Sequence, residues 1–233
     1  MASSAGQTRK RSSQFQPRHR VGPLTDPRSE LVGRGYDTIG ERFTEWRDRI
    51  VGDPRREWEE ELVSRLQDGV RILELGCGAG VPDTQRLAAR FQVTGVDVSA
   101  EQIRRARAAV PEAEFIQADF TALELPPESF DAVVSFYAFN HVPRELLAPT
   151  FARINRWLVP RGLLMTALGT SDTEAWTGDW LGAPTFFSSF PMATRPSSGY
   201  WRGDELRVGT RRWRAVMPRR VAWPSCVAVL RPP

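Results

Sequence analysis

The chain of 233 residues is long enough for one α/β domain with a full hydrophobic core, and we expect no second domain of that size. It has no apolar run long enough to span a membrane and no apolar stretch near its N-terminus, so we expect a soluble, cytoplasmic protein without a membrane partner. Two cysteines and two histidines exclude a disulfide framework and a histidine-rich metal site, so no metal is expected.

Positive charge is concentrated at the two ends of the chain. Residues 1–20 carry a net charge of +5 and residues 193–233 one of +7, although the whole chain carries only +4. Residues 21–192 therefore carry a net charge of −8, which would repel a polyanion from the body of the protein. We expect no specific nucleic-acid partner, and we interpret the basic ends as solvated segments.

The N-terminal part of the chain divides into a tail and two helices. Residues 1–22 are rich in Ser, Gln and Arg and contain no acid, so we expect a disordered basic tail. Residues 29–48 and 54–68 predict two helices, and in the second of them apolar residues recur at helical spacing from Trp58 to Leu66.

A glycine-rich turn follows the first predicted strand. The apolar pattern of residues 71–75 leads directly into Gly76-Cys77-Gly78-Ala79-Gly80, and a helix is expected at 83–91. Alternate glycines let backbone amides approach a ligand closely, and the following helix adds its positive dipole end. The turn predicts a nucleotide-like cofactor. It lacks the last glycine or alanine of the dinucleotide fingerprint, because Val81 occupies that position, so an NAD-dependent oxidoreductase is disfavoured.

Acidic residues stand at the ends of the next predicted strands. Strand 92–97 ends at Asp97, strand 113–117 is followed by Asp119, and a further strand is expected at 130–136. An acid about twenty residues after a glycine turn is the usual partner of a ribose diol. A glycine turn without a ligand would not explain these successive acids.

The alternation of strands and helices continues toward the C-terminus. Helices are expected at 100–109 and 144–158, and the last clear strand at 162–168. Alternation at this period implies a parallel sheet that is covered by helices on both faces. Ser99 and Gln102 form a capping box for the helix at 100–109.

The four ordered motifs between Leu73 and His141 resemble those of the class I S-adenosylmethionine-dependent methyltransferases, and weaker similarity extends from about Tyr36 to Phe190. The resemblance implies an α/β, Rossmann-like methyltransferase fold with a mostly parallel, doubly wound sheet over residues 23–192. It also implies S-adenosyl-L-methionine as the cofactor and methyl transfer to a small-molecule acceptor by in-line displacement. The sequence does not define an oligomeric state.

The resemblance also assigns roles at the cofactor site. Glu74 would address the amino group of the methionine part, and Asp97 would accept both ribose hydroxyls. Val98 would lie against the adenine ring, while Asp119 and the backbone of Phe120 would contact the polar edge of the adenine. The expected cofactor-binding residues are Tyr36, Glu74, Gly76, Cys77, Gly78, Gly80, Asp97, Val98, Gln102, Asp119, Phe120 and Ser135.

Two of these assignments have an alternative. Gln102 serves either the cofactor or only the cap of its own helix. In the family the segment that contains Tyr36 folds over the cofactor, so Tyr36, Phe43 and Trp46 are candidates for a lid. Packing of an amphipathic helix on the sheet explains Phe43 and Trp46 equally well.

The acceptor side is expected beyond the strand at 130–136. His141 follows that strand, where it could deprotonate an acceptor hydroxyl as the catalytic residue or merely orient the loop before the next helix. The segment 176–187 is long, aromatic and glycine-containing, and its aromatic residues either wall a substrate pocket or form a satellite core beneath a loop. The expected substrate-pocket residues are Phe136, Trp176, Trp180, Phe186 and Phe187.

The sequence around His141 bears on the class of acceptor. Residues 139–143 do not match the Asn/Asp-Pro-Pro-aromatic signature of the family's amino-methylating nucleic-acid enzymes. The departure favours a small-molecule acceptor. A cofactor-binding but catalytically weak or inactive regulatory or partner-binding module is the rival interpretation, and turnover distinguishes the two.

Residues 193–233 depart most from the family pattern. The family has a helix and then an antiparallel strand pair that closes the sheet, but residues 194–199 are helix breakers. We expect an atypical basic segment that is partly disordered or forms makeshift closing strands at 206–208 and 227–230. Its Arg, Pro and Trp content is also what a shifted reading frame in a GC-rich gene would produce.

Overall fold

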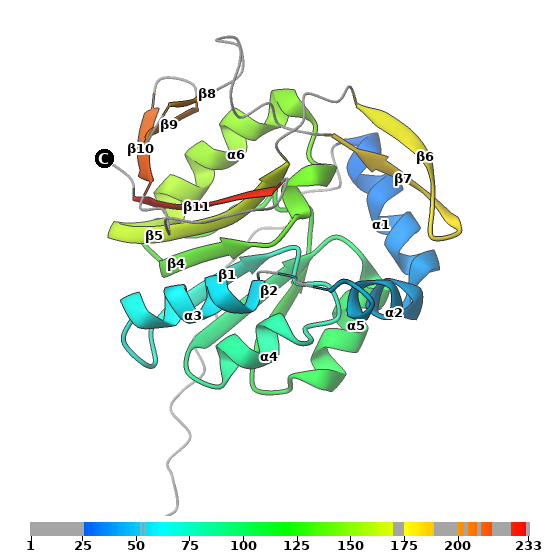
Figure 1. The fold of residues 1–233 in the computed structure, drawn as a ribbon, viewed down its shortest axis with the longest axis horizontal. Coiled ribbons are helices and arrows are strands. Elements are labelled where there is room, and N and C mark those ends of the chain that lie inside the picture. The colour runs from blue at the N-terminus through cyan, green and yellow to red at the C-terminus, as the bar shows by residue number, and fades with distance from the viewer. Residues whose placement is uncertain are drawn as a thin grey trace, which may run out of the picture.

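The computed structural model describes residues 26–51, 53, 55–169 and 175–188, together with the backbone of four strands between 200 and 231. Strands and helices alternate through its centre, as the sequence predicts (Figure 1). These central elements are β1 (Arg71–Leu75), α4 (Asp83–Ala88), β2 (Gln92–Asp97), α5 (Ala100–Ala109), β3 (Glu114–Gln117), β4 (Phe130–Ser135), the short 3₁₀ helix η1 (Ala138–His141), α6 (Arg144–Trp157) and β5 (Leu158–Gly169).

Five parallel strands form the centre of the sheet in the order β3-β2-β1-β4-β5. The chain moves outward from β1 to β3 and then returns to the other side of β1 with β4, so the strand order reverses between β1 and β4. The expected α/β, doubly wound fold class is thus confirmed. In such sheets, ligands bind outside the carboxyl ends of the strands at the point of reversal.

Both faces of the sheet are buried, which explains why its strands are continuously apolar. In β1, Ile72 points into a core shared with Trp58 and Leu87, whereas Leu73 points into a core shared with α6. Helix α5 packs through Ile103 in a third cluster. Helices therefore cover both faces, as the sequence pattern predicts.

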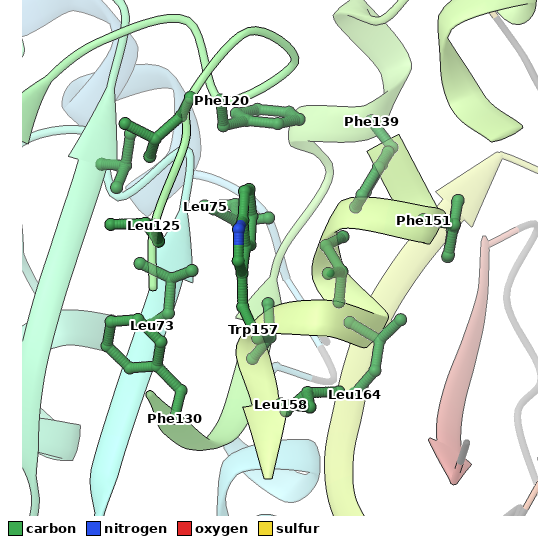
Figure 2. Close-up of a cluster of buried hydrophobic side chains, with 14 of the residues drawn as sticks. Leu73, Leu75, Phe120, Leu125, Phe130, Phe139, Phe151, Trp157, Leu158 and Leu164 are labelled. Carbon is green, nitrogen blue, oxygen red and sulfur yellow. The ribbon is translucent and has the colours of Figure 1, made fainter. Parts of the chain in front are cut away.

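The largest cluster lies between the sheet and α6. Figure 2 shows the indole of Trp157 standing between Leu73 and Leu125 on one side and Phe151 and Leu164 on the other. Trp157 has no exposed surface. Because this packing fixes α6 against β4 and β5, it also fixes the turn before α6, which carries His141.

The N-terminal helical region differs from the expectation of one helix at 29–48. The chain forms α1 (Pro27–Ile39) and α2 (Glu41–Asp48), with Gly40 between them at a φ of 54° and a ψ of −121°. A side chain would be strained in that conformation, so the glycine permits the bend. Helix α2 buries none of its residues completely.

Two other helices are shorter than expected. Helix α3 (Arg55–Arg65) replaces the helix expected at 54–68, since Gly69 has a φ of 82° and turns the chain into β1. Helix α4 ends at Ala88 rather than at residue 91 because Gln92 already pairs with the start of β1.

The aromatic segment at 176–187 is a β-hairpin and not a loop. Strands β6 (Trp176–Trp180) and β7 (Ala183–Phe187) are joined by Leu181 and Gly182, with φ values of 50° and 80°. Positive φ at both central residues is the geometry of a tight hairpin turn. Strand β7 packs beside α1 (Figure 1), where a Cβ on Gly35 would lie only 2.6 Å from the carbonyl oxygen of Pro184.

Four antiparallel strands extend the sheet beyond β5. Strand β11 (Ser225–Arg231) pairs with β5 along its length, and it is followed outward by β10 (Arg211–Ala215), β9 (Glu205–Val208) and β8 (Tyr200–Arg202). The strands expected at 206–208 and 227–230 fall within β9 and β11. The tail expected at 1–22 and the breakers at 194–199 lie outside the described residues. Within the described part of the chain, no helix has the length and apolarity needed to span a membrane.

Candidate functional site

A cavity of about 420 Å³ opens at the carboxyl ends of the parallel strands, where the strand order reverses. Its size and place are those of a small-ligand or cofactor site. It is lined by Ser29, Val32, Tyr36, Phe43, Trp46, Arg47, Ile50, Asp53, Arg55, Gly76, Gly78, Asp97, Val98, Asp119, Phe120, Thr121, Phe136, Tyr137, Ala138, Asn140, His141, Val142, Trp180 and Phe187.

The glycine turn after β1 forms one wall of the cavity. Gly76 and Gly78 have φ values of 74° and 54° and line the cavity directly. A Cβ on Gly76 would lie 2.3 Å from the Cβ of Ala138, so only a glycine allows the turn that follows β4 to pack here. Cys77 and Gly80 do not line the cavity. Cys77 is buried, and a Cβ on Gly80 would contact α5.

Asp97, at the end of β2, is tied to the glycine turn. Its Oδ2 accepts the N–H of Gly78 and its Oδ1 accepts the N–H of Ser99, both at 2.9 Å. Burial raises the pKa of the Asp97 carboxyl, while these backbone hydrogen bonds act in the opposite direction. Asp97 and the adjacent Val98 both line the cavity. The two backbone donors fix the carboxylate before any ligand binds.

Asp119, after β3, presents an unused oxygen to the cavity. Its Oδ1 accepts both the N–H and the hydroxyl of Thr121, at 2.8 and 2.7 Å. Its Oδ2 is buried, and in the part of the chain that the structure describes no group donates to it. Buried carboxylate oxygens are normally hydrogen-bonded, so this atom is available to accept an N–H or O–H from a ligand. Phe120 lines the cavity beside it.

Glu74 lies behind the glycine turn rather than in the cavity lining. The side chain is 2% exposed, and its Oε2 accepts the hydroxyl of Thr84 at 2.6 Å. Burial, and then the negative charge of Asp83, raise the pKa of Glu74 to about 8. The carboxyl is therefore largely neutral at pH 7.

This raised pKa predicts a pH-dependent cost in stability. Between the ordinary pKa of 4.5 and about 8, folded Glu74 keeps a proton that the unfolded chain has released, so the free energy of unfolding falls as pH rises. The side chain of Glu74→Gln cannot ionise. The free energy of unfolding of this variant, relative to that of the wild type, should therefore rise by at least about 1.4 kcal/mol between pH 5 and pH 8.5, the equivalent of one pKa unit. Urea unfolding of both proteins at the two pH values measures this. A difference that stays constant with pH would contradict it.

Gln102 and Ser135 also lie outside the cavity lining. The N–H of Gln102 donates to Ser99 Oγ at 3.1 Å, which is one half of the expected capping box. The other half is absent, because the N–H of Ser99 donates to Asp97 and not to Gln102, whose Nε2 donates to the carbonyl of Gly40 at 3.2 Å. Ser135 donates its hydroxyl to the carbonyl of Leu75 at 3.0 Å and so joins β4 to the end of β1.

His141 and Tyr36 form a hydrogen-bonded pair in the cavity wall. His141 Nδ1 lies 2.7 Å from the carbonyl oxygen of Phe186, which can only accept, so Nδ1 carries the proton. Nε2 then accepts the hydroxyl of Tyr36 at 2.9 Å. Burial lowers the pKa of His141 to about 4, and burial followed by the charge of Asp97 raises the pKa of Tyr36. Both side chains are therefore neutral at pH 7.

Aromatic rings from three segments also line the cavity. Tyr36, Phe43, Trp46, Trp180 and Phe187 all line it, and Trp180 makes edge contacts with the other four rings. Phe43 and Trp46, which the sequence assigns either to a lid or to the core, both lie in the cavity lining.

The predicted substrate-pocket residues divide into two groups. Phe136, Trp180 and Phe187 line the cavity. Trp176 is 46% exposed and stacks on the outer side of Phe187, and Phe186 is buried with only its carbonyl directed to His141. Phe186 is outside the lining because side chains alternate between the two faces of a strand, whereas Trp176 shares a face with Trp180 but lies at the other end of β6.

Several charged lining residues were not predicted. Arg55 binds Asp53 and also donates from Nη1 to Asp83 Oδ2 at 3.0 Å. Arg47 donates to the carbonyl of Val81 and pairs with the exposed Asp48 at 3.1 Å. No motif marks these residues in the sequence.

Tyr137 and Asn140 were also missed. Tyr137 has a φ of 68°, which is unusual for a residue with a side chain, and it lies at the end of β4 in the cavity wall. Such strain concentrates at functional sites. The described residues contain no cluster of three or more His, Cys, Asp or Glu side chains that could hold a metal ion.

Comparisons with known proteins show which family this chain resembles. A family model described as a methyltransferase domain matches residues 72–162. The chain is 36% identical over 148 residues to an uncharacterized methyltransferase of Bacillus licheniformis, covering 58% of this chain and 68% of that protein. It is 29% identical over 141 residues to 27-O-demethylrifamycin SV methyltransferase of Amycolatopsis mediterranei, covering 52% of each, so it spans about half the length of that relative.

Among solved structures, the [4+2]-cyclase SpnF superposes with a TM-score of 0.53 at 23% identity, covering 65% of this chain and 64% of that one. This likeness concerns the fold alone. Because that protein is described as a cyclase, the fold does not by itself define the reaction.

Proposed function

Because the chain belongs to the class I S-adenosylmethionine-dependent methyltransferases, we propose that it transfers a methyl group from S-adenosyl-L-methionine to a small-molecule acceptor. One observation carries the proposal. Two carboxylates, Asp97 and Asp119, face one cavity beside the glycine turn, and Asp119 Oδ2 has no donor within the described residues. The relative from Amycolatopsis is named for a small molecule, which supports the same class of acceptor.

The cavity residues fit the chemical groups of this cofactor. Asp97 would accept hydroxyls of the ribose, and the open Asp119 Oδ2 would accept an N–H from the adenine amino group. Val98 and Phe120 would supply apolar contacts to the ring. The backbone of Gly76 and Gly78 would pass under the methionine part, because no Cβ stands in the way.

The protein's main catalytic task is alignment. S-adenosyl-L-methionine, when bound, supplies a methyl group on a positively charged sulfonium. When the acceptor atom is held in line with that methyl, the reaction no longer depends on a bimolecular encounter. Such positioning can lower the activation free energy by roughly 7–11 kcal/mol. The aromatic rings that close the cavity would exclude water and hold the acceptor in place.

Tyr36 and His141 would handle the proton of the acceptor. The hydroxyl hydrogen of Tyr36 is already directed to His141 Nε2, so the oxygen of Tyr36 can accept a hydrogen bond from the acceptor. As the methyl is transferred, the acceptor proton would pass to Tyr36 and the proton of Tyr36 to His141. The carbonyl of Phe186 holds the ring in the tautomer that this requires.

Ligand binding tests the proposal. We expect isothermal titration calorimetry to give micromolar dissociation constants for S-adenosylmethionine and S-adenosylhomocysteine and at least tenfold weaker binding of NAD. Asp119→Asn should weaken binding of S-adenosylhomocysteine, because an amide nitrogen at the position of Oδ2 cannot accept the same hydrogen bond. Asp131→Asn serves as a control, because Asp131 lies at the start of β4 and the cavity lies at the other end of the strands. Tighter binding of NAD would refute the proposal, and cofactor binding without turnover of any acceptor would favour the inactive module.

A further inference from the structure

The charges in the cavity lining come from only some of the elements that form it. All of them come from α2, from residues 53 and 55, and from the ends of β2 and β3. Six lining residues from α1, η1 and the hairpin β6–β7 form what we call the acceptor wall: Val32, Tyr36, Asn140, His141, Trp180 and Phe187. No member of this wall carries a formal charge at pH 7, since His141 is neutral.

The two arginines in the lining are already neutralised. Arg55 is held between Asp53 and Asp83. The side chains of Arg47 and Arg55 each have only about a tenth of their surface exposed. Arg47 pairs with Asp48. An anionic acceptor group would therefore have to break an existing ion pair in order to gain one.

A cationic acceptor group fits the wall no better. Aromatic faces can bind an ammonium ion, but Trp180 meets the neighbouring rings of the wall edge to face, as it meets Phe187 at 5.3 Å and 90°. The acceptor wall offers no carboxylate to replace the water that the cation would lose. The sulfonium of the cofactor would also repel a second positive charge beside it.

The proton path indicates which atom is methylated. A neutral amine has a free electron pair and needs no base, whereas a neutral hydroxyl oxygen must lose its proton to become a good nucleophile. The pair of Tyr36 and His141 provides such a base. Burial makes it a weak one, with the pKa of His141 at about 4, so it suits a hydroxyl that is itself acidic.

We infer, on the basis of the proposed methyl transfer, that the acceptor is an uncharged ring compound methylated on an acidic hydroxyl, a phenol or an enol. The hydroxyl proton passes through Tyr36 to His141, the oxygen–methyl bond forms and the methyl–sulfur bond breaks. The products are a neutral ether and a neutral thioether, and the proton leaves from His141 to solvent.

Four probes with the same ring test the inference. They are 2-naphthol, 2-naphthoate, 2-naphthylmethylammonium and 2-(2-naphthyl)ethanol, titrated into the protein saturated with S-adenosylhomocysteine. We expect 2-naphthol to bind at least tenfold more tightly than the anion or the cation. With S-adenosylmethionine, we expect mass spectrometry to detect the methyl ether of 2-naphthol and no ether of the aliphatic alcohol.

Variants on one strand provide the matched control. Trp180→Ala should weaken binding of 2-naphthol at least tenfold, because Trp180 belongs to the acceptor wall. Trp176→Ala, on the same strand but outside the lining, should change it less than twofold. Tyr36→Phe keeps the ring but loses the hydroxyl, so it should weaken 2-naphthol binding less than Trp180→Ala does and should lose at least tenfold in its rate of methylation.

Each contrary result overturns a specific claim. Failure of wild-type protein to bind S-adenosylhomocysteine overturns the proposed function itself. With normal cofactor binding, preference for the naphthoate would show that Arg47 and Arg55 select an anion, and preference for the ammonium would show an aromatic cage for cations. The proposed acceptor class is overturned by either of these preferences. It is also overturned if the aliphatic alcohol is methylated or if none of the four probes binds.

Discussion

His141→Ala is expected to lower kcat by about 10²- to 10⁴-fold, the usual contribution of a general base, and to leave the affinity for S-adenosylhomocysteine unchanged. The affinity should survive because His141 contacts Tyr36 and the carbonyl of Phe186, not the carboxylates at the ends of β2 and β3. Calorimetry and turnover of a methylated acceptor, measured on the same preparation, give the two quantities.

His141→Gln separates a chemical role from a structural one. Its amide oxygen can still accept the hydroxyl of Tyr36, but it cannot take up a proton. We expect this variant to be as slow as His141→Ala. Wild-type turnover in His141→Gln would show that the histidine only positions Tyr36.

Asp97→Ala should weaken binding of S-adenosylhomocysteine by ~1 to 3 kcal/mol, because ribose hydroxyls would lose their acceptor and remain unpaired. The substitution also releases the N–H of Gly78, which Asp97 Oδ2 now holds at 2.9 Å. Gln102→Ala is the comparison, since Gln102 lies outside the cavity lining and bonds the carbonyl of Gly40. It should reduce affinity by less than threefold and act mainly on thermal stability. Equal losses of affinity in the two variants would contradict the assignment of Asp97.

The central sheet was predictable because its signals are local. Each of the strands β1, β2 and β4 is a short apolar run next to a helix with its own periodicity or cap, and α5 begins and ends where Ser99 and its apolar spacing predict. The bend at Gly40 was not predictable, because a single glycine is tolerated in a helix and only the packing of α2 on the hairpin selects the break.

The hairpin β6–β7 was missed for a different reason. Its turn uses Leu181 with positive φ, and a leucine carries no sequence signal for that conformation. The charged stretch around Arg55 was missed because ion pairs such as Arg55 with Asp83 join residues from separate elements.

The cofactor side of the site was easier to predict than the acceptor side. Asp97 and Asp119 follow strands that end at the same edge of the sheet, so their meeting follows from the topology. Tyr36 and His141 are 105 residues apart, and their contact depends on the close approach of α1 and β7 at Gly35. The charge pattern that motivates the acceptor class depends on this packing, which the sequence does not reveal.

A crystal structure of the protein with S-adenosylhomocysteine tests the central claim most directly. We predict the ligand in the cavity at the end of β1, with its ribose hydroxyls on Asp97 and its adenine amino group within hydrogen-bond distance of Asp119 Oδ2. A ligand bound elsewhere, or in this cavity with neither carboxylate in contact, would contradict the account.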